Sequence, residues 1–163
     1  MIGCSEEIRI PFADRRTDHE VELAVVIGRK AKRVPREEAL DYVFGYTIGL
    51  DMTVRGPEFP TFRNSPDTFC VLGPWIATKD EIADPNVLDL SIRVNQEVKQ
   101  ASNTKYLIFD VQRLIEYASA IYTLNPGGVI VTGTPAGVGP VAPGDVLEGR
   151  ISEIGAMTVY VAR

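Results

Sequence analysis

The stretch VELAVVIG, from Val21 to Gly28, decides the fold class. It is apolar, rich in β-branched residues and closed by a glycine, and it is too short for a buried helix, so it predicts a strand. Further along, YTIGLDM at Tyr46–Met52 predicts a second strand. Between the two, Pro35–Val43 predicts a short helix that Gly45 ends. The chain therefore begins with sheet-forming segments.

The rest of the chain continues this mixture of strands and short helices. Strands are predicted at Thr68–Thr78, Leu88–Val94 and Val129–Val131, the first with a turn at Gly73 and Pro74 and the second ending in a hairpin at Asn95 and Gln96. Asp110–Ala120 has apolar residues at helical spacing and an aspartate at the N-cap position, which predicts the best helix of the chain. We expect one β-rich α+β domain over residues 1–163.

Composition limits the class of partner. The chain has 163 residues, of which 45% are hydrophobic and 24% charged, as in an ordinary globular domain. The net charge of −5, from 22 acidic and 17 basic residues, argues against nucleic acid. No apolar run approaches the roughly 20 residues that cross a bilayer, and the start lacks the order of a signal peptide. We therefore predict a cytoplasmic protein with a small-molecule partner, and inert thiols at Cys4 and Cys70.

Acidic residues stand at the ends of the two predicted strands. Glu20 and Glu22 are two positions apart at the start of a strand, so their carboxylates project on the same side. Asp51 ends the second strand, and strand pairing can carry it to the same place. Three carboxylates suit Mg²⁺ or Mn²⁺ with water in the open positions. By itself this pattern also fits a solvated face, and His19, which points to the opposite side, is predicted to be structural or exposed.

A glycine-rich segment, TGTPAGVG at residues 132–139, follows the predicted strand Val129–Val131. It lacks the spacing of a dinucleotide-binding loop and the lysine of a phosphate-binding loop, which argues against a nucleotide. Backbone N–H groups of such a turn, with the hydroxyl of Thr134, can hold a carboxylate. The alternative is an ordinary turn at a strand end.

Taken in order, several segments resemble one family. They are HEVELAVVIGRKAKRV, DYVFGYTIGLDMTVRG, SPDTFCVLGPWIAT, VNQEVKQASNT and GGVIVTGTPAGVGPV, and together they cover nearly the whole chain. This ordered set resembles the fumarylacetoacetate hydrolase (FAH) family. The resemblance implies the family's mixed β-sandwich roll and a homodimer.

The resemblance also implies a site. Glu20, Glu22 and Asp51 would be the ligands of Mg²⁺, Mn²⁺ or Ca²⁺, and Arg55 and Thr134 would contact a small oxo-carboxylic acid substrate. We therefore expect Thr134 to lie beside the metal centre, with Ile130 and Val131 buried. For Arg55 the alternative is a simple ion pair with Glu58, and for Thr134 a simple turn.

Three functions follow from the resemblance. The leading one is metal-dependent isomerisation or decarboxylation of 2-oxo or 1,3-dicarbonyl acids through a stabilised enolate, as in aromatic catabolism, because the VLGPW and SNT segments look most like bacterial members of that type. The second is an acylpyruvate or fumarylacetoacetate-type C–C hydrolase, which needs a base that activates water. The third, from another class, is a non-catalytic protein that binds metal and an oxo acid.

Two departures from the family pattern predict reduced turnover. Asn64 stands where family members usually carry a lysine, and an amide supplies hydrogen bonds but no charge. The family's N-terminal lid segment has no counterpart before Met1, so either the start is misassigned or truncated, or the chain is a lidless homologue. We expect weak catalysis, with retained binding of metal and of oxalate.

Overall fold

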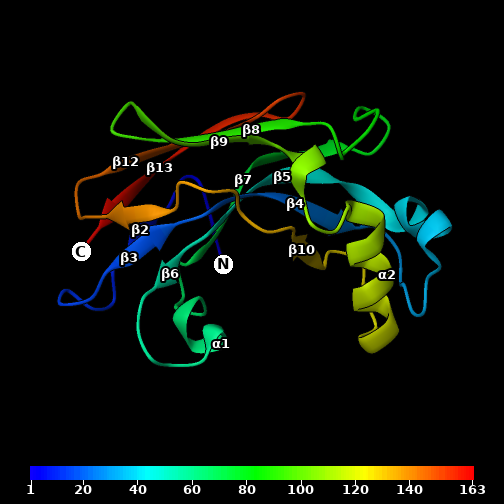
Figure 1. Cartoon of the computed structure of the whole chain (residues 1–163), viewed down its shortest axis with the longest axis horizontal. Coiled ribbons are helices and arrows are strands. Elements are labelled where there is room, and N and C mark those ends of the chain that lie inside the picture. The colour runs from blue at the N-terminus through cyan, green and yellow to red at the C-terminus, as the bar shows by residue number, and fades with distance from the viewer.

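The computed structural model describes residues 1–163 and arranges them as three sheets with few helices (Figure 1). The first sheet has the strand order β1 (Ile2–Gly3), β7 (Cys70–Thr78), β5 (Val43–Asp51), β4 (Val21–Ile27) and β10 (Val129–Val131). The predicted strand at Val21–Gly28 is confirmed as β4. It is hydrogen bonded to a neighbour on each side and buried along its whole length, which explains its unbroken apolar character.

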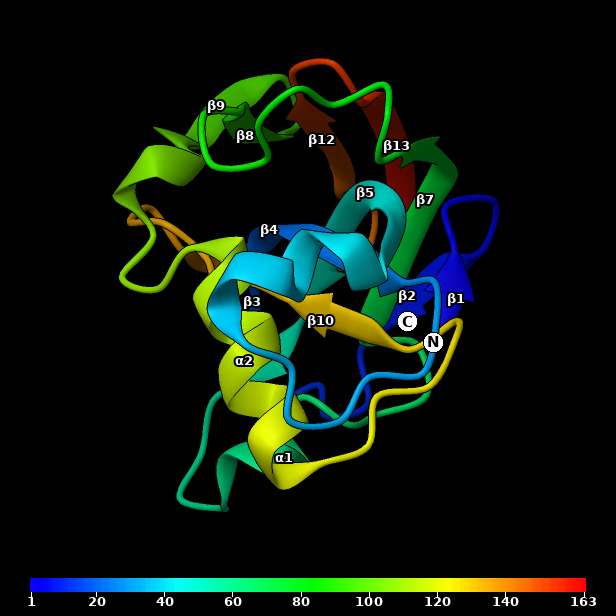
Figure 2. The ribbon, with the colours of Figure 1, turned by 90° about the vertical axis from the view of Figure 1, so that its right-hand side faces the viewer.

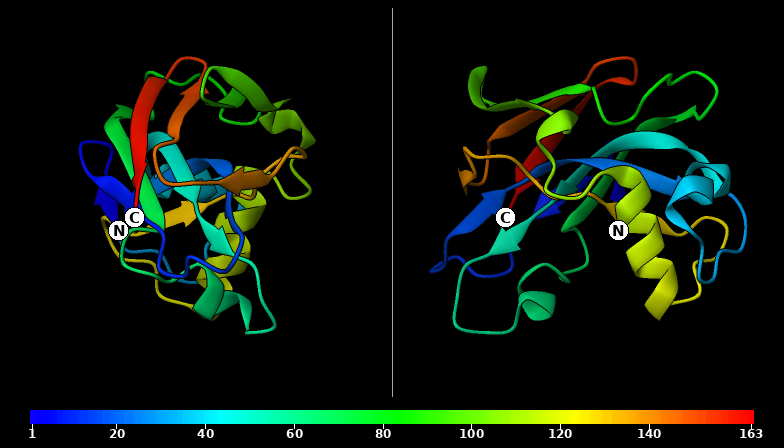
Figure 3. Two further views of the ribbon diagram at one scale, coloured as in Figure 1. Left: turned by 90° about the vertical axis from the view of Figure 1, so that its left-hand side faces the viewer. Right: turned by 45° about the vertical axis from the view of Figure 1, so that its right-hand side comes forward.

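Two further sheets complete the fold. The second contains β11 (Gly139–Val141), β3 (Thr17–His19) and β6 (Thr53–Val54). The third has the order β2 (Glu7–Arg9), β13 (Gly155–Ala162), β12 (Val146–Ile151), β8 (Asp89–Val94) and β9 (Glu97–Asn103). Strand β13, red in Figure 3, pairs with β2 near the start of the chain, so residues from both ends share one sheet.

The helices are short and occupy the periphery. They are the 3₁₀ helices η1 (Arg36–Tyr42) and η2 (Thr104–Tyr106) and the α-helices α1 (Pro60–Arg63) and α2 (Val111–Ile121). Asp110 caps α2, as predicted, by accepting a hydrogen bond from the backbone N–H of Arg113. Figure 2 shows α2 and η1 together beside β4 and β10. None of the helices combines the length and the apolar character that crossing a membrane requires.

The hydrophobic core contains 32 buried residues and lies where the first and third sheets face each other. Alternate residues of β4, namely Val21, Leu23 and Val25, belong to it. Because successive side chains of a strand point to opposite faces, Glu22 projects away from this core. Burial of the apolar face therefore sets the direction in which the acidic side chain points.

Two glycine predictions are corrected. Gly45 does not end the first helix: β5 begins at Val43, and a Cβ on Gly45 would lie 2.2 Å from the carbonyl oxygen of Ala77 in the neighbouring strand. Gly73 and Pro74 form no turn between strands but lie within β7, at an irregularity in its register with β5. A proline, which lacks an N–H, is tolerated at such a bulge.

The strand before the glycine-rich segment also differs from expectation. Ile130 and Val131 were predicted to be buried, and they are half-buried. The reason is the position of β10 at the edge of its sheet, where it pairs only with β4. The hairpin predicted at Asn95 and Gln96 is confirmed, and both residues have the positive φ angles, 50° and 73°, that favour a tight turn between strands.

Candidate metal centre

Three carboxyl groups converge beside the first sheet. Glu20, Glu22 and Asp51 each place a carboxylate oxygen within 4.8 Å of the other two. Glu22 is buried, and Glu20 and Asp51 are half-buried. The structure thus brings together the three acidic residues that the sequence analysis selected.

Pairing between β4 and β5 produces this convergence. The two strands are antiparallel, with Val21 opposite Leu50 and Glu22 opposite Gly49. The backbone N–H of Asp51 donates to the carbonyl oxygen of Glu20 over 2.9 Å, which places the last residue of β5 against the first acid. Gly49 has no side chain, and a Cβ there would contact Ala24 and Val131 at 3.4 Å. The three acids come together because they lie at the same end of the β4–β5 pair.

Burial makes the negative charges of this cluster costly. It raises the pKa of Glu22 to about 7, and repulsion by Asp51 and Glu20 acts in the same direction, although the N–H of Gly133 opposes it. Burial also raises the pKa of Glu20 and of Asp51 above their ordinary values, against hydrogen bonds from Arg55 and Asn64 respectively. Buried carboxylates this close together need a positive partner, and only Glu20 has one in the protein.

The raised pKa of Glu22 predicts how the stability of the metal-free chain depends on pH. Between the ordinary pKa of Glu22, 4.5, and its value of about 7 in the fold, the folded state holds a proton that the unfolded state has released. Raising the pH through this window should therefore lower the free energy of unfolding, by roughly 3 kcal/mol for this group. Urea unfolding in EDTA at pH 5 and pH 7.5 measures the change. Glu22→Gln should flatten the slope, and an equal slope in both proteins would rule out Glu22 as its source.

Arg55 lies beside the acidic cluster and is held by two carboxylates. Its Nε donates to Asp18 and its Nη2 to Glu20, each over 2.7 Å. The alternative ion pair with Glu58 is wrong, because Glu58 pairs with Arg15 over 2.7 Å. The third guanidinium nitrogen, Nη1, has no hydrogen-bond partner in the protein. Arg55 thus fixes the position of Glu20 and keeps Nη1 free to donate.

Asp18 is the counter-charge that orients Arg55. Burial raises its pKa, but hydrogen bonds and charges from Arg16 and Arg55 outweigh burial and hold the pKa below its ordinary value. Its side chain is only 2% exposed. Asp18 could not be selected from the sequence, because one aspartate between a threonine and a histidine has no pattern that distinguishes it.

Asn64 lies at the edge of the cluster. It follows α1, and its side-chain amide donates to Asp51 over 3.4 Å, a long hydrogen bond. The loop before it is anchored by Arg15, which donates to the carbonyl oxygen of Arg55 and to Glu58. The structure therefore places the residue at the family's lysine position directly beside one of the three acids.

The glycine-rich segment passes along the same strand end. The backbone N–H of Gly133 donates to Glu22 over 2.6 Å, and the hydroxyl of Thr134 donates to the carbonyl oxygen of Val21 over 2.9 Å. Gly133 has a φ of 100°, which favours glycine at this position. Thr134 is therefore adjacent to β4, next to the acidic cluster, as predicted from the sequence.

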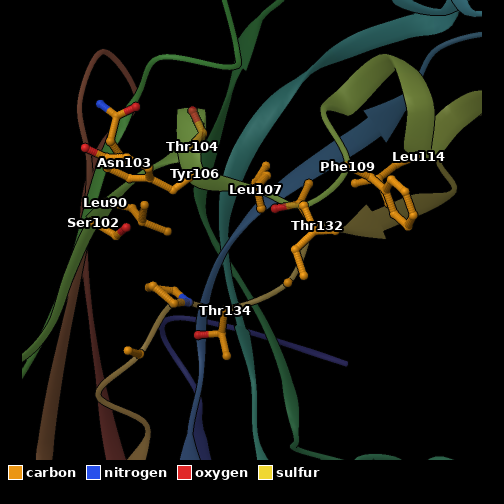
Figure 4. A pocket seen from close by; sticks show the side chains of 14 residues that line it. Leu90, Ser102, Asn103, Thr104, Tyr106, Leu107, Phe109, Leu114, Thr132 and Thr134 are labelled. Carbon is orange, nitrogen blue, oxygen red and sulfur yellow. The ribbon is translucent and has the colours of Figure 1, made fainter.

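A cavity of about 500 Å³ adjoins this segment. Figure 4 shows Thr132 and Thr134 on one side of it and Ser102 and Leu90 on another. The three acids do not line the cavity. Gly133 connects the two features, because it lines the cavity and its N–H donates to Glu22.

Comparison with known proteins places this geometry in a family. The family model described as fumarylacetoacetate (FAA) hydrolase C-terminal matches residues 1–162. This chain belongs to the fumarylacetoacetate hydrolase family. The resemblance stated from the sequence is therefore confirmed, and so is the fold class.

Two enzymes illustrate the similarity within the family. The maleylpyruvate hydrolase of Aquipseudomonas alcaligenes is 55% identical over 161 residues, a match that covers 99% of this chain and 56% of that protein. The crystal structure of maleylpyruvate hydrolase from Sphingobium sp. SYK-6, in complex with manganese(II) ion and pyruvate, is 44% identical with a TM-score of 0.94 and covers 99% of this chain and 61% of its own. The chain thus spans less than two thirds of the length of either enzyme.

A third relative has a different reaction in its name. The crystal structure of 2-hydroxyhepta-2,4-diene-1,7-dioate isomerase from Mycobacterium marinum is 43% identical with a TM-score of 0.94, and the match covers 99% of this chain and 65% of that one. Hydrolases and isomerases of the family therefore share this core fold. The choice between the reactions depends on more than the fold.

Proposed function

We propose that this chain forms the metal-dependent core of an enzyme that hydrolyses the C–C bond of a small acylpyruvate, a 2-oxo acid with a second carbonyl group. The observation that carries the proposal is the convergence of Glu20, Glu22 and Asp51 within 4.8 Å, with the backbone N–H of Gly133 bound to Glu22. The 55% identity to a maleylpyruvate hydrolase favours hydrolysis over the isomerisation or decarboxylation that the sequence analysis placed first.

The donor set fits a hard divalent cation. The three carboxylates have raised pKa values, and only Glu20 has a cationic partner. They offer oxygen ligands of the kind that Mg²⁺ and Mn²⁺ prefer. When bound, such an ion would polarise the oxo group of the substrate and stabilise negative charge that develops beside it. We propose Glu20, Glu22 and Asp51 as its ligands.

Residues around the acids would bind and orient the substrate. Arg55 keeps Nη1 free while Asp18 and Glu20 hold the rest of its guanidinium, so it can donate to a substrate carboxylate without turning. The segment at Gly133 and Thr134 faces the same strand end. In the reaction, water adds to the acyl carbon, the C–C bond breaks, and the three-carbon fragment takes up a proton to become pyruvate.

Two other functions stay open to test. The isomerase from M. marinum, 43% identical, supports a tautomerisation or decarboxylation that uses the same enolate stabilisation without adding water. The non-catalytic binder is motivated by Asn64, which supplies no charge next to Asp51. The homodimer and the cytoplasmic location predicted above stay predictions.

The deciding experiment is an assay of pyruvate release. We expect the chain to form pyruvate from maleylpyruvate with Mn²⁺ or Mg²⁺, to stop when EDTA removes the ion, and to resume when Mn²⁺ is restored. Oxaloacetate, assayed alongside, tests decarboxylation. If calorimetry shows that the ion binds but neither compound is consumed, the enzymatic proposal fails and the binder takes its place.

A further inference from the structure

Gln100, on β9, connects three segments that are distant in sequence. Its side chain is buried, with the residue 1% exposed. The amide oxygen contacts Nδ1 of His19 at 3.0 Å and the backbone N–H of Val21 at 3.2 Å. The amide nitrogen donates to Thr134 Oγ1 and to the carbonyl oxygen of Pro135, each over 2.8 Å. Both ends of this amide therefore have two partners.

The partners fix which way the amide points. The carbonyl of Pro135 can only accept a hydrogen bond, and the backbone N–H of Val21 can only donate one. Nε2 must therefore face the glycine-rich segment, and Oε1 must face β4. A flipped amide would set two acceptors against each other at Pro135 and two donors at Val21.

This orientation determines where two hydrogen atoms lie. Since Oε1 of Gln100 accepts, Nδ1 of His19 must carry a hydrogen, whatever the charge on the ring. Since Nε2 donates to Thr134 Oγ1, the one hydroxyl hydrogen of Thr134 is left for the carbonyl oxygen of Val21. The hydroxyl of Thr134 therefore has no hydrogen to give to a substrate carboxylate.

The backbone of Thr134 has the donor that its side chain lacks. Its N–H makes no hydrogen bond within the protein, whereas the N–H of Gly133 before it is committed to Glu22. Of these two neighbouring N–H groups, one is therefore bound to the acidic cluster and the other is free to bind a ligand. The position of the free N–H depends on the side chain of Thr134, which Gln100 and Val21 hold.

We propose that Gln100 is a positioning residue that holds the Thr134–Pro135 turn against the start of β4, so that the backbone N–H of Thr134, and not its hydroxyl, binds the substrate carboxylate. This inference rests on the proposed function, because it concerns the same site. It assigns a role to a neutral buried side chain that touches neither the substrate nor the cation. It also gives the hydroxyl of Thr134 a purely internal role.

Binding of pyruvate to the Mn²⁺-loaded chain tests the assignment by a double-mutant cycle. Gln100→Met keeps the approximate shape without the amide, and Thr134→Val keeps the backbone N–H without the hydroxyl. We expect each variant to weaken pyruvate binding by roughly tenfold, and the double variant by no more than that, because both remove the same support. Affinity for Mn²⁺ alone should change by less than about threefold, since its ligands remain.

The same pyruvate titration includes a control variant and shows which results would contradict the proposal. Ser119→Ala removes a buried hydroxyl in α2, which accepts from Val34 and donates to Glu116, and it should leave pyruvate binding unchanged. Losses that multiply to about a hundredfold in the double variant would show that the Thr134 hydroxyl meets pyruvate directly, and would overturn the proposal. Unchanged binding in Gln100→Met would overturn it as well.

A second measurement is independent of the proposed function. His19 is the single histidine of the chain, so ¹⁵N NMR of the imidazole gives one set of ring signals without a variant. We expect Nδ1 to carry a hydrogen. A bare Nδ1 would mean that the Gln100 amide is reversed and the positioning proposal wrong, even if pyruvate binds. Conversely, the predicted tautomer with no pyruvate binding to the Mn²⁺-loaded chain would reject the proposed function and, with it, the role of Thr134.

Discussion

Replacing Glu22 with glutamine should weaken Mn²⁺ binding by on the order of 100-fold or more, while making the metal-free chain more stable above pH 7. The two effects have one cause. Glu22 is buried among like charges, so its ionised form is costly without a cation and valuable with one. Residues that merely orient a metal ligand already contribute roughly 10- to 100-fold in affinity, and a charged ligand should contribute at least as much.

The opposite signs make this prediction specific. Isothermal titration with Mn²⁺ measures the affinity, and urea unfolding in EDTA at pH 8 measures the stability. Glutamine can still accept the hydrogen bond from Gly133, so a general collapse of the segment is not expected. Glu148→Gln removes the same charge from an exposed position on β12 and should change neither quantity appreciably. Unaltered Mn²⁺ affinity in Glu22→Gln would exclude Glu22 as a ligand.

Segments whose structure depends on local sequence were predicted well. β4 is a continuous apolar run, α2 has an aspartate cap and helical spacing, and the hairpin at Asn95 and Gln96 has residues that tolerate positive φ. In each case the residues that set the conformation lie within a few positions of one another. Neighbouring strands were not needed to recognise them.

Segments whose structure depends on a partner strand were predicted less well. Gly45 and Gly73 both resemble turn residues, yet both lie within strands, because the close approach of β7 to β5 and the bulge at Pro74 exist only once those strands pair. The half-burial of Ile130 likewise follows from the edge position of β10. The sequence of one strand does not say what lies beside it.

The candidate site shows the same division. Charged residues at strand ends could be selected from their chemistry, and strand pairing then brings Glu20, Glu22 and Asp51 together. Gln100 and Asp18 could not be selected, since their importance comes from contacts with segments tens of positions away. The stretch VNQEVKQASNT contributed to the family resemblance, but nothing in it marks Gln100 as a buried amide with four hydrogen bonds.

Asn64→Lys should raise the rate of pyruvate formation by on the order of 100-fold, provided that the chain has the proposed activity. The amide of Asn64 lies 3.4 Å from a carboxylate oxygen of Asp51, so a lysine there would bring a full positive charge to the edge of the acidic cluster. A single electrostatic contact to developing negative charge typically contributes 10²- to 10³-fold in rate, and an uncharged amide supplies less of it. The same charge should repel the cation and weaken Mn²⁺ binding a few-fold.

The two readouts separate the possible outcomes of that substitution. Turnover is measured at saturating Mn²⁺, so that weaker metal binding does not mask a faster reaction, and Asn125→Lys adds the same charge at an exposed position as a control. If turnover stays unchanged while Mn²⁺ affinity falls, the ammonium group has reached the cluster, and the charge is not needed for the reaction. The amide of Asn64 would then suffice for catalysis, and the expectation of weak turnover drawn from this residue would have to be abandoned.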